Sequence, residues 1–249
     1  MNRNPAHASA ERPCTFSAVV PAAGRGERMG QRKALLKLAG RPMLLHTLER
    51  LMAARGCTEV VIAVHPDDLE CFTSEWADRL RKEFRVSAIV PGGEYRQQSV
   101  LAALEATRAE ADLILIHDAA RPLVQPQLIE QVAARAAQTG AAIAAVPSVA
   151  TVKEVNADGR ILSTPPRESL WLAQTPQGFR RELILRAHRR AQDEGFLGTD
   201  DALLVERMGV PVVIVEDSAE NLKITTPADL VVAEVILKRQ QDAGAARSR

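Results

Sequence analysis

The amino-acid sequence predicts an α/β protein in which a mostly parallel sheet carries helices on both faces and one β-hairpin arm projects from it. Short apolar runs alternate with segments of helical periodicity along most of the chain, as in parallel sheets covered on both sides. This alternation breaks once, at about 149–166. With 249 residues, 46% of them hydrophobic, the chain is long enough for one large core. We therefore expect one domain over 15–240, with a disordered tail at 1–14 and a flexible tail at 241–249.

Apolar runs and helical spacing define the expected elements. Strands are expected at 16–21, 59–64, 86–90, 113–117, 141–147 and 211–215. Helices are expected at 43–55, 67–84, 96–107, 126–139, 181–194, 200–208 and 227–238. Leu44, Leu48 and Leu51 illustrate the helical spacing, whose simplest explanation is packing against the core. Residues 174–179 carry neither pattern and are expected to be irregular.

The interruption of the alternation has the pattern of a hairpin. Two strand-like runs, 150–155 and 160–162, flank the turn Asn156-Ala157-Asp158-Gly159. A two-stranded ribbon is marginal in water by itself, so we expect the arm to pack against a second copy of the chain. The hairpin therefore predicts a homodimer.

Composition limits the classes of partner. The formal net charge is +1 and aromatic residues make up 3%, so the chain has neither the positive field nor the stacking surface of a nucleic-acid binder. No apolar run is long enough to cross a bilayer, and the polar N-terminal segment lacks the pattern of a secretory signal. The three cysteines form no C-x-x-C pair, which is typical of a cytoplasmic protein.

The first expected strand ends in a glycine-rich segment that carries two cations. The segment begins with Ala22-Ala23-Gly24 and continues through Gly26, Arg28 and Lys33. Glycines let backbone N–H groups approach anionic oxygens, and the cations add positive charge beside them, as a triphosphate site requires. The spacing fits neither a Walker loop nor the dinucleotide-binding G-x-G-x-x-G fingerprint. A flexible surface turn is the alternative explanation.

Charged residues at the carboxyl end of the fourth expected strand are further candidates, because ligands of such sheets bind at that edge. Asp118 follows an apolar run there, and its carboxylate could ligate Mg²⁺ or cap the following turn. Arg121 could bind a phosphate through its planar guanidinium, with a surface ion pair as the alternative. His117 is expected to orient or pack rather than react.

Two other segments carry polar groups beside apolar neighbours. In the run Gly92-Gly93-Glu94, backbone groups together with the Ser99 hydroxyl could bind a base edge, although helix initiation explains the run nearly as well. Lys223 is expected in a short strand near an anion, with protection of a sheet edge as the alternative.

Taken in order, these motifs resemble those of the 2-C-methyl-D-erythritol 4-phosphate cytidylyltransferase family, which uses CTP. The resemblance covers about 16–238 and depends most on the His117-Asp118-Ala119-Ala120-Arg121-Pro122 run and the Asn221-Leu222-Lys223-Ile224-Thr225 run. It implies a Rossmann-like sheet of the nucleotidyltransferase and glycosyltransferase-A type. It also implies that the nucleotide binds at Ala22, Ala23, Gly24, Gly26, Gly93, Glu94 and Ser99. The catalytic cations would be Arg28, Lys33 and Lys223. The acceptor would bind at Asp118, Arg121, Thr151, Arg167 and Thr175.

The reaction that the resemblance implies is nucleotidyl transfer, with Mg²⁺ as cofactor. CTP and 2-C-methyl-D-erythritol 4-phosphate would give 4-diphosphocytidyl-2-C-methyl-D-erythritol and pyrophosphate, a step of non-mevalonate isoprenoid precursor synthesis. A cytidylyltransferase for another polyol phosphate, such as ribitol 5-phosphate, is the first alternative. A module that senses CTP without turnover is the second.

Overall fold

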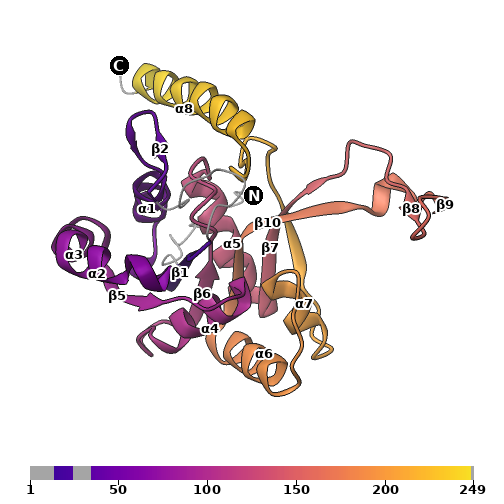
Figure 1. Cartoon of the computed structure of the whole chain (residues 1–249), viewed down its shortest axis with the longest axis horizontal. Helices are drawn as coiled ribbons and strands as arrows, with labels where there is room; N and C mark the ends of the chain where they lie inside the picture. The colour runs from indigo at the N-terminus through magenta and orange to yellow at the C-terminus, as the bar shows by residue number, and fades with distance from the viewer. Residues whose placement is uncertain (1–13, 25–34, 248–249) are drawn as a thin grey trace, which may run out of the picture.

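The computed structural model describes residues 14–24 and 35–247 and is built around one seven-stranded sheet. The strand order is β11-β7-β10-β6-β1-β4-β5 (Figure 1). The bounds are β1 Phe16–Ala22, β4 Cys57–Val64, β5 Val86–Pro91, β6 Leu113–Ile116, β7 Ala141–Pro147, β10 Trp171–Arg180 and β11 Val213–Glu216. Strands β1, β4, β5 and β6 pair in parallel, as do β7 and β11, whereas β10 runs antiparallel to both of its neighbours. The carboxyl ends of β1, β5 and β6 therefore lie at the same edge of the sheet.

Helices cover both faces of this sheet. The bounds are α1 Met43–Ala53, α2 Leu69–Cys71, α3 Ala77–Phe84, α4 Arg96–Glu105, α5 Pro126–Thr139, α6 Arg181–Asp193, α7 Asp201–Glu206 and α8 Pro227–Arg247. Because side chains alternate along a strand, Ala18 and Val20 of β1 pack with α1, α3 and α5, whereas Val19 packs with α4, α6 and α7. The mostly parallel sheet with helices on both faces is thus confirmed.

A third apolar cluster holds the C-terminal helix against the main layers. Ala233 and Leu237 of α8 pack with Leu38, Met43 and Ile224. Leu38 belongs to a small hairpin formed by β2, Lys37–Leu38, and β3, Arg41–Pro42. This cluster fixes the chain immediately after Lys223, because Ile224 is one of its members.

Most predicted elements are present, but three details differ. Residues 174–179 belong to β10, in the middle of the sheet, and only the part between Ala173 and Gln177 is irregular in its pairing with β7. Pro176 and Gly178 made this strand hard to predict, because both residues are rare in central strands. The expected helix at 67–84 is a succession of short turns, at Pro66–Asp68, α2 and Phe72–Trp76, followed by α3. Helix α8 continues to Arg247, so 241–247 are helical where a flexible tail was expected.

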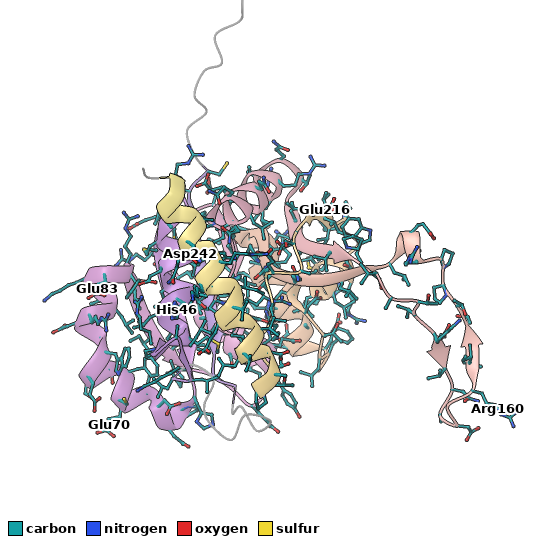
Figure 2. All side chains as sticks on the ribbon, turned by 90° about the horizontal axis from the view of Figure 1, so that it is seen from above. His46, Glu70, Glu83, Arg160, Glu216 and Asp242 are labelled. Atoms are coloured by element: carbon teal, nitrogen blue, oxygen red, sulfur yellow. The ribbon has the colours of Figure 1, made fainter. Side chains whose placement is uncertain are left out.

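The predicted arm is present and projects from the body of the molecule (Figures 1 and 2). Strands β8, Glu154–Val155, and β9, Ile161–Ser163, pair antiparallel. The Asn156 carboxamide oxygen closes the turn by accepting the backbone N–H groups of Asp158 at 3.1 Å and Arg160 at 2.9 Å. Val155 and Ile161 on the ribbon are exposed. Among the described helices, none is both long and apolar enough to cross a bilayer.

Gly56 lies in the connection between α1 and β4, where its backbone has φ +95°. A Cβ at this position would overlap the carbonyl oxygen of Cys14. We expect Gly56→Ala to lower the free energy of unfolding by about 2–5 kcal/mol, because left-handed strain adds to a steric clash with backbone. Urea unfolding measures this loss.

Gly209→Ala is the matched control for that substitution. Gly209 has φ +75° but open space around the position of a Cβ, so only the strain of about 1–2 kcal/mol applies. Equal losses for the two variants would show that the overlap with Cys14 has no energetic weight.

Candidate active site

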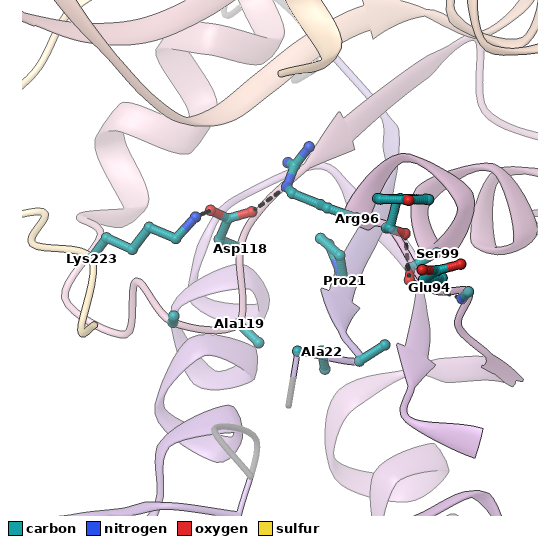
Figure 3. A pocket seen from close by; sticks show the side chains of 13 residues that line it. Pro21, Ala22, Glu94, Arg96, Ser99, Asp118, Ala119 and Lys223 are labelled. Atoms are coloured by element: carbon teal, nitrogen blue, oxygen red, sulfur yellow. Dashed lines mark hydrogen bonds and ion pairs between the residues drawn. The ribbon is translucent and has the colours of Figure 1, made fainter. Parts of the chain in front are cut away.

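A pocket opens at the carboxyl edge of β1, β5 and β6 (Figure 3). Four segments form it: the chain after β1, the connection from β5 to α4, the chain after β6, and the segment before α8. Its lining residues are Pro21, Ala22, Ala23, Gly24, Gly93, Glu94, Tyr95, Arg96, Ser99, Asp118, Ala119, Ala120 and Lys223. Most of the predicted nucleotide-binding residues thus line one cavity together with Asp118 and Lys223.

The connection from β5 to α4 packs tightly against the end of β1. A Cβ on Gly92 would overlap the Ala23 side chain and approach the Ser99 hydroxyl to 2.7 Å. The buried Ser99 Oγ accepts the Gly93 N–H at 3.1 Å and donates to the Tyr95 carbonyl at 3.3 Å. Ser99 therefore holds the shape of this connection, while the exposed Glu94 side chain faces the pocket.

Asp118 is the centre of charge in the pocket. Its Oδ2 lies 2.7 Å from Lys223 Nζ, and its Oδ1 accepts Arg96 Nε–H at 3.0 Å (Figure 3). Although burial acts to raise the pKa of Asp118, the charges of Arg96 and Lys223 outweigh it and hold the pKa well below its ordinary value. The carboxylate is therefore ionised at neutral pH.

The Lys223 segment runs alongside the chain that follows Asp118. Ile224 N–H donates to the Ala120 carbonyl at 2.8 Å, and the Arg121 guanidinium donates to the Asn221 carbonyl at 2.6 Å. These two bonds flank Lys223 and direct its side chain toward Asp118. Residues 221–225 form no strand, so the expected strand and its edge-protection alternative are both wrong.

His117 and Thr175 lie beneath the pocket and fix the backbone of Asp118. Thr175 Oγ1 accepts the Asp118 N–H at 3.0 Å and lies 3.1 Å from His117 Nδ1. His117 Nε2 lies 3.0 Å from the Arg121 carbonyl oxygen. This network assigns the proton to Nε2, with Nδ1 accepting from the threonine hydroxyl. Burial lowers the pKa of His117 to about 4, although the bond to the Arg121 carbonyl opposes the shift.

Arg121 is buried beside polar atoms that have no hydrogen-bond partner. The residue has an exposed fraction of 8%, which makes the surface ion-pair alternative wrong. Among the described residues, four buried side-chain atoms have no hydrogen-bond partner: Arg121 Nε, Gln174 Oε1, Asn221 Oδ1 and His188 Nδ1. The first three belong to side chains that meet at Asn221. Buried polar atoms are rarely left unpaired, so this region beside the pocket is suited to a polar ligand or to water.

Arg96 also forms an ion pair with the buried carboxylate of Asp201. Its NH1 donates to Asp201 Oδ2 at 2.8 Å, and Asp201 Oδ1 lies 3.1 Å from His188 Nε2. Burial acts to raise the pKa of Asp201. The charge of Arg96 and the hydrogen bond from His188 act in the opposite direction and outweigh burial, so the pKa lies below its ordinary value. One guanidinium thus spans two carboxylates that are 83 positions apart in the chain (201 − 118).

The remaining predicted residues lie elsewhere. Thr151 and Arg167 are exposed at the base of the arm and do not line the pocket. Gly26, Arg28 and Lys33 lie outside the described residues. Sequence reasoning missed Arg96, Asp201 and Asn221. Arg96 had a detectable signal, since it follows Gly92-Gly93-Glu94 at the start of a helix, and Asn221 lies in the run that contains Lys223; Asp201 had none comparable.

Comparison with known proteins assigns the family. The profile of the 2-C-methyl-D-erythritol 4-phosphate cytidylyltransferase family matches residues 16–239. The chain belongs to this family. It is therefore a nucleotidyltransferase of the cytidylyltransferase type, and the resemblance expected from the sequence is confirmed.

Cytidylyltransferases of this name are similar along nearly the whole chain. A relative from Pelotomaculum thermopropionicum is 48% identical over 227 residues, which cover 90% of this chain and 95% of the relative. Another from Desulforamulus reducens is 46% identical over 225 residues, which cover 90% and 96%.

Solved structures agree with these sequence relatives. The cytidylyltransferase from Thermus thermophilus has a TM-score of 0.74 and 36% identity, covering 90% of this chain and 99% of that one. A 4-diphosphocytidyl-2C-methyl-D-erythritol synthase from Anaerococcus prevotii has a TM-score of 0.79 and 28% identity, covering 91% and 97%. The nucleotidyltransferase fold is thereby confirmed.

In this cytidylyltransferase, the neutral state of His117 gives a pH dependence to stability. The pKa falls from 6.5 in the unfolded chain to about 4 in the fold, so between these values only the unfolded chain binds the proton. Stability should fall as the pH drops from 6.5 to about 4, by roughly 3 kcal/mol from this group. Urea unfolding across that range measures the slope.

His117→Gln removes the titrating group and keeps a donor for the Arg121 carbonyl. We expect this variant to be less stable at neutral pH and to lose most of the acid slope of the wild type. The remaining slope comes from groups such as His46, whose pKa is also lowered, mainly by burial. An unchanged slope in the variant would contradict the assignment to His117.

Proposed function

We propose that the protein transfers the cytidylyl group of CTP to the phosphate of 2-C-methyl-D-erythritol 4-phosphate and releases pyrophosphate. The observation that carries this proposal is the pairing of Lys223 with Asp118 inside a pocket built by the family's motifs, in a chain that matches the family from 16 to 239. The product would be 4-diphosphocytidyl-2-C-methyl-D-erythritol, a precursor in non-mevalonate isoprenoid synthesis.

The chemistry is an in-line displacement at phosphorus. An oxygen of the acceptor phosphate forms a bond to the α-phosphorus of CTP, and the bond from that phosphorus to the bridging oxygen of pyrophosphate breaks. The second pKa of a phosphate monoester is about 6, so the nucleophile is already ionised and a general base is unnecessary. The protein therefore has to supply position and positive charge.

Lys223 is suited to supply that charge. Its side chain is 40% exposed at the pocket while its ammonium remains on Asp118. A phosphate that enters the pocket offers a second anion, to which the ammonium turns with little movement of its stem. We propose the same catalytic role for Arg28 and Lys33, on the strength of the family motif.

The pocket supports part of the proposed nucleotide and acceptor assignments, because Ala22, Ala23, Gly24, Gly93, Glu94, Ser99 and Asp118 line it. We propose that Gly93 and Ser99 lie around the cytosine together with Ala22 and Ala23. We propose Gly24, Gly26 and Glu94 as further nucleotide-binding residues, on the strength of the family motif. Asp118, Arg121 and Thr175 would hold the acceptor, helped by the unpaired polar atoms of the buried Gln174 and Asn221.

We propose that Mg²⁺ is bound mainly by the phosphates of the substrate, with one carboxylate of the protein. Within the described residues there is no group of three or more His, Cys, Asp or Glu side chains arranged to hold a metal. Mg²⁺ commonly keeps several waters and binds through one or two carboxylates plus substrate phosphates, and we propose Asp118 as the carboxylate on the protein side. When bound with the triphosphate, the ion neutralises charge on the phosphate oxygens.

We also propose a homodimer in which the arm reaches a second copy. Val149, Val152, Val155, Ile161 and Leu162 are exposed on a thin ribbon. A two-fold interface hides such residues, and it would bring Thr151 or Arg167 toward the partner's acceptor site. A cytoplasmic location agrees with the three cysteines, which are free thiols.

Purified protein with Mg²⁺ should convert CTP and 2-C-methyl-D-erythritol 4-phosphate to the cytidine diphosphate conjugate and pyrophosphate. Pyrophosphate release measures the rate, and parallel reactions contain ATP, UTP or ribitol 5-phosphate. Equal turnover of ATP or UTP would contradict the base assignment. Preference for ribitol 5-phosphate would contradict the acceptor assignment, and CTP binding without turnover would support the sensing alternative.

Shared acceptor sites predict complementation between inactive chains. Arg167→Ala and Lys223→Ala should each lose most activity alone, because one removes an acceptor contact and the other a phosphate cation. Mixed in equal amounts, they should regain up to about a quarter of wild-type activity, since a heterodimer has one intact site when Arg167 acts across the two-fold axis. Verified heterodimers without any recovery would contradict the proposed arrangement.

A further inference from the structure

Asp201 is a buried carboxylate outside the pocket that is linked to it through a single side chain. It is 1% exposed and does not line the cavity. Its Oδ2 binds Arg96 NH1, and Arg96 Nε binds Asp118, which in turn binds Lys223. This series of contacts therefore connects the buried Asp201, at the start of α7, with the Lys223 ammonium at the pocket wall.

We propose that Asp201 is a positioning residue for the transfer reaction, acting through Arg96 to set the geometry of the Asp118–Lys223 pair. This inference rests on the proposed function. A guanidinium held by two carboxylates has a fixed plane and offers Asp118 only its Nε–H, so the second oxygen of Asp118 remains for Lys223.

Loss of the Asp201 charge would change what Arg96 does at the pocket. The formal charges of Asp118, Asp201, Arg96 and Lys223 sum to zero, so an amide at 201 leaves one uncompensated positive charge. The Arg96 side chain is 30% exposed and has room to turn. A guanidinium free of Asp201 favours two-point binding to Asp118, which competes with Lys223 for the same carboxylate.

A separate contact keeps the local backbone in place without Asp201. Gln97 Nε2 donates to the Phe196 carbonyl at 2.9 Å, and the Gly198 N–H donates to Gln97 Oε1 at 2.9 Å. These bonds join the first turn of α4 to the segment that precedes α7. Substitution of Asp201 therefore affects mainly the charge and orientation of Arg96 rather than the course of the chain.

Asp201→Asn is the test substitution, because an amide oxygen still accepts from His188 while the amide nitrogen no longer attracts Arg96. We expect kcat to fall about 10–100-fold, the size of effect that a small misplacement at the reacting centre produces. KM for CTP and for the acceptor should stay within about threefold, since no pocket residue has changed. A change in KM with kcat unaltered would overturn the proposal.

A double-mutant cycle separates this role from a structural one. If Asp201 acts through Arg96, Asp201→Asn should change kcat by less than about twofold in an Arg96→Gln background. Fully additive losses would overturn the proposal. If Asp201→Asn does not fold, Asp201→Glu replaces it as the test variant, because it keeps the charge but displaces it by one methylene. A kcat of Asp201→Glu equal to that of the wild type would then overturn the proposal.

Glu59→Gln is the matched control for loss of a buried carboxylate. Glu59 is 4% exposed and binds Ser17, Ser87 and the Arg108 backbone near the starts of β1 and β4, away from the pocket. It should lower the melting temperature but leave kcat unchanged. Wild-type protein without turnover of CTP and the acceptor would defeat the proposed function, whereas active wild type with an equally active Asp201→Asn would defeat only this inference.

Discussion

A buried, ionised carboxylate needs cationic partners, and the structure of the pocket depends on meeting this need at Asp118. Without partners, an ionised side chain in that position costs several kcal/mol, about as much as the stability margin of many domains. Arg96 and Lys223 remove that cost by approaching the two oxygens of Asp118 from different parts of the chain. Three segments are thereby drawn to one point: the end of β6, the start of α4 and the residues before α8. The pocket lies between these three segments and the chain after β1.

The antiparallel strand β10 gives this centre a rigid floor. Its insertion between β6 and β7 brings Thr175 beneath Asp118, where the hydroxyl binds the Asp118 backbone and the neutral ring of His117. His117 is neutral because burial disfavours its charged form, so the ring adds no positive charge that would compete for Asp118. Positive charge in the described pocket therefore comes from Arg96 and Lys223, and both are held by Asp118 in the absence of substrate.

Local sequence patterns predicted the elements whose formation depends on neighbouring residues in the sequence. The six expected strands and the helices α1, α4, α5 and α6 follow from apolar periodicity. Motifs singled out Asp118 at a strand end, Ser99 after the third strand and Lys223, although the short strand expected around Lys223 is absent. Strand β10 was not predictable in this way, because Gln174, Thr175 and Pro176 replace the apolar alternation by which strands are detected. The pairing of Arg96 with Asp201 links positions 105 residues apart and leaves no periodic trace in the sequence. Such contacts are set by the fold, and only the fold reveals them.

Charge balance in the pocket explains how a protein of formal net charge +1 is suited to two phosphorylated substrates. Arg96 and Lys223 are compensated by Asp118 and Asp201, so these four side chains bring cations to the pocket without adding net formal charge. Preorganised charge of this kind stabilises a transition state because little reorientation is needed when the negative charge develops. It also avoids general attraction to polyanions, which a net positive surface would cause. Selectivity then depends on which ligand fits the geometry around Asp118, because an anion that does not reach Lys223 gains little from entering the pocket.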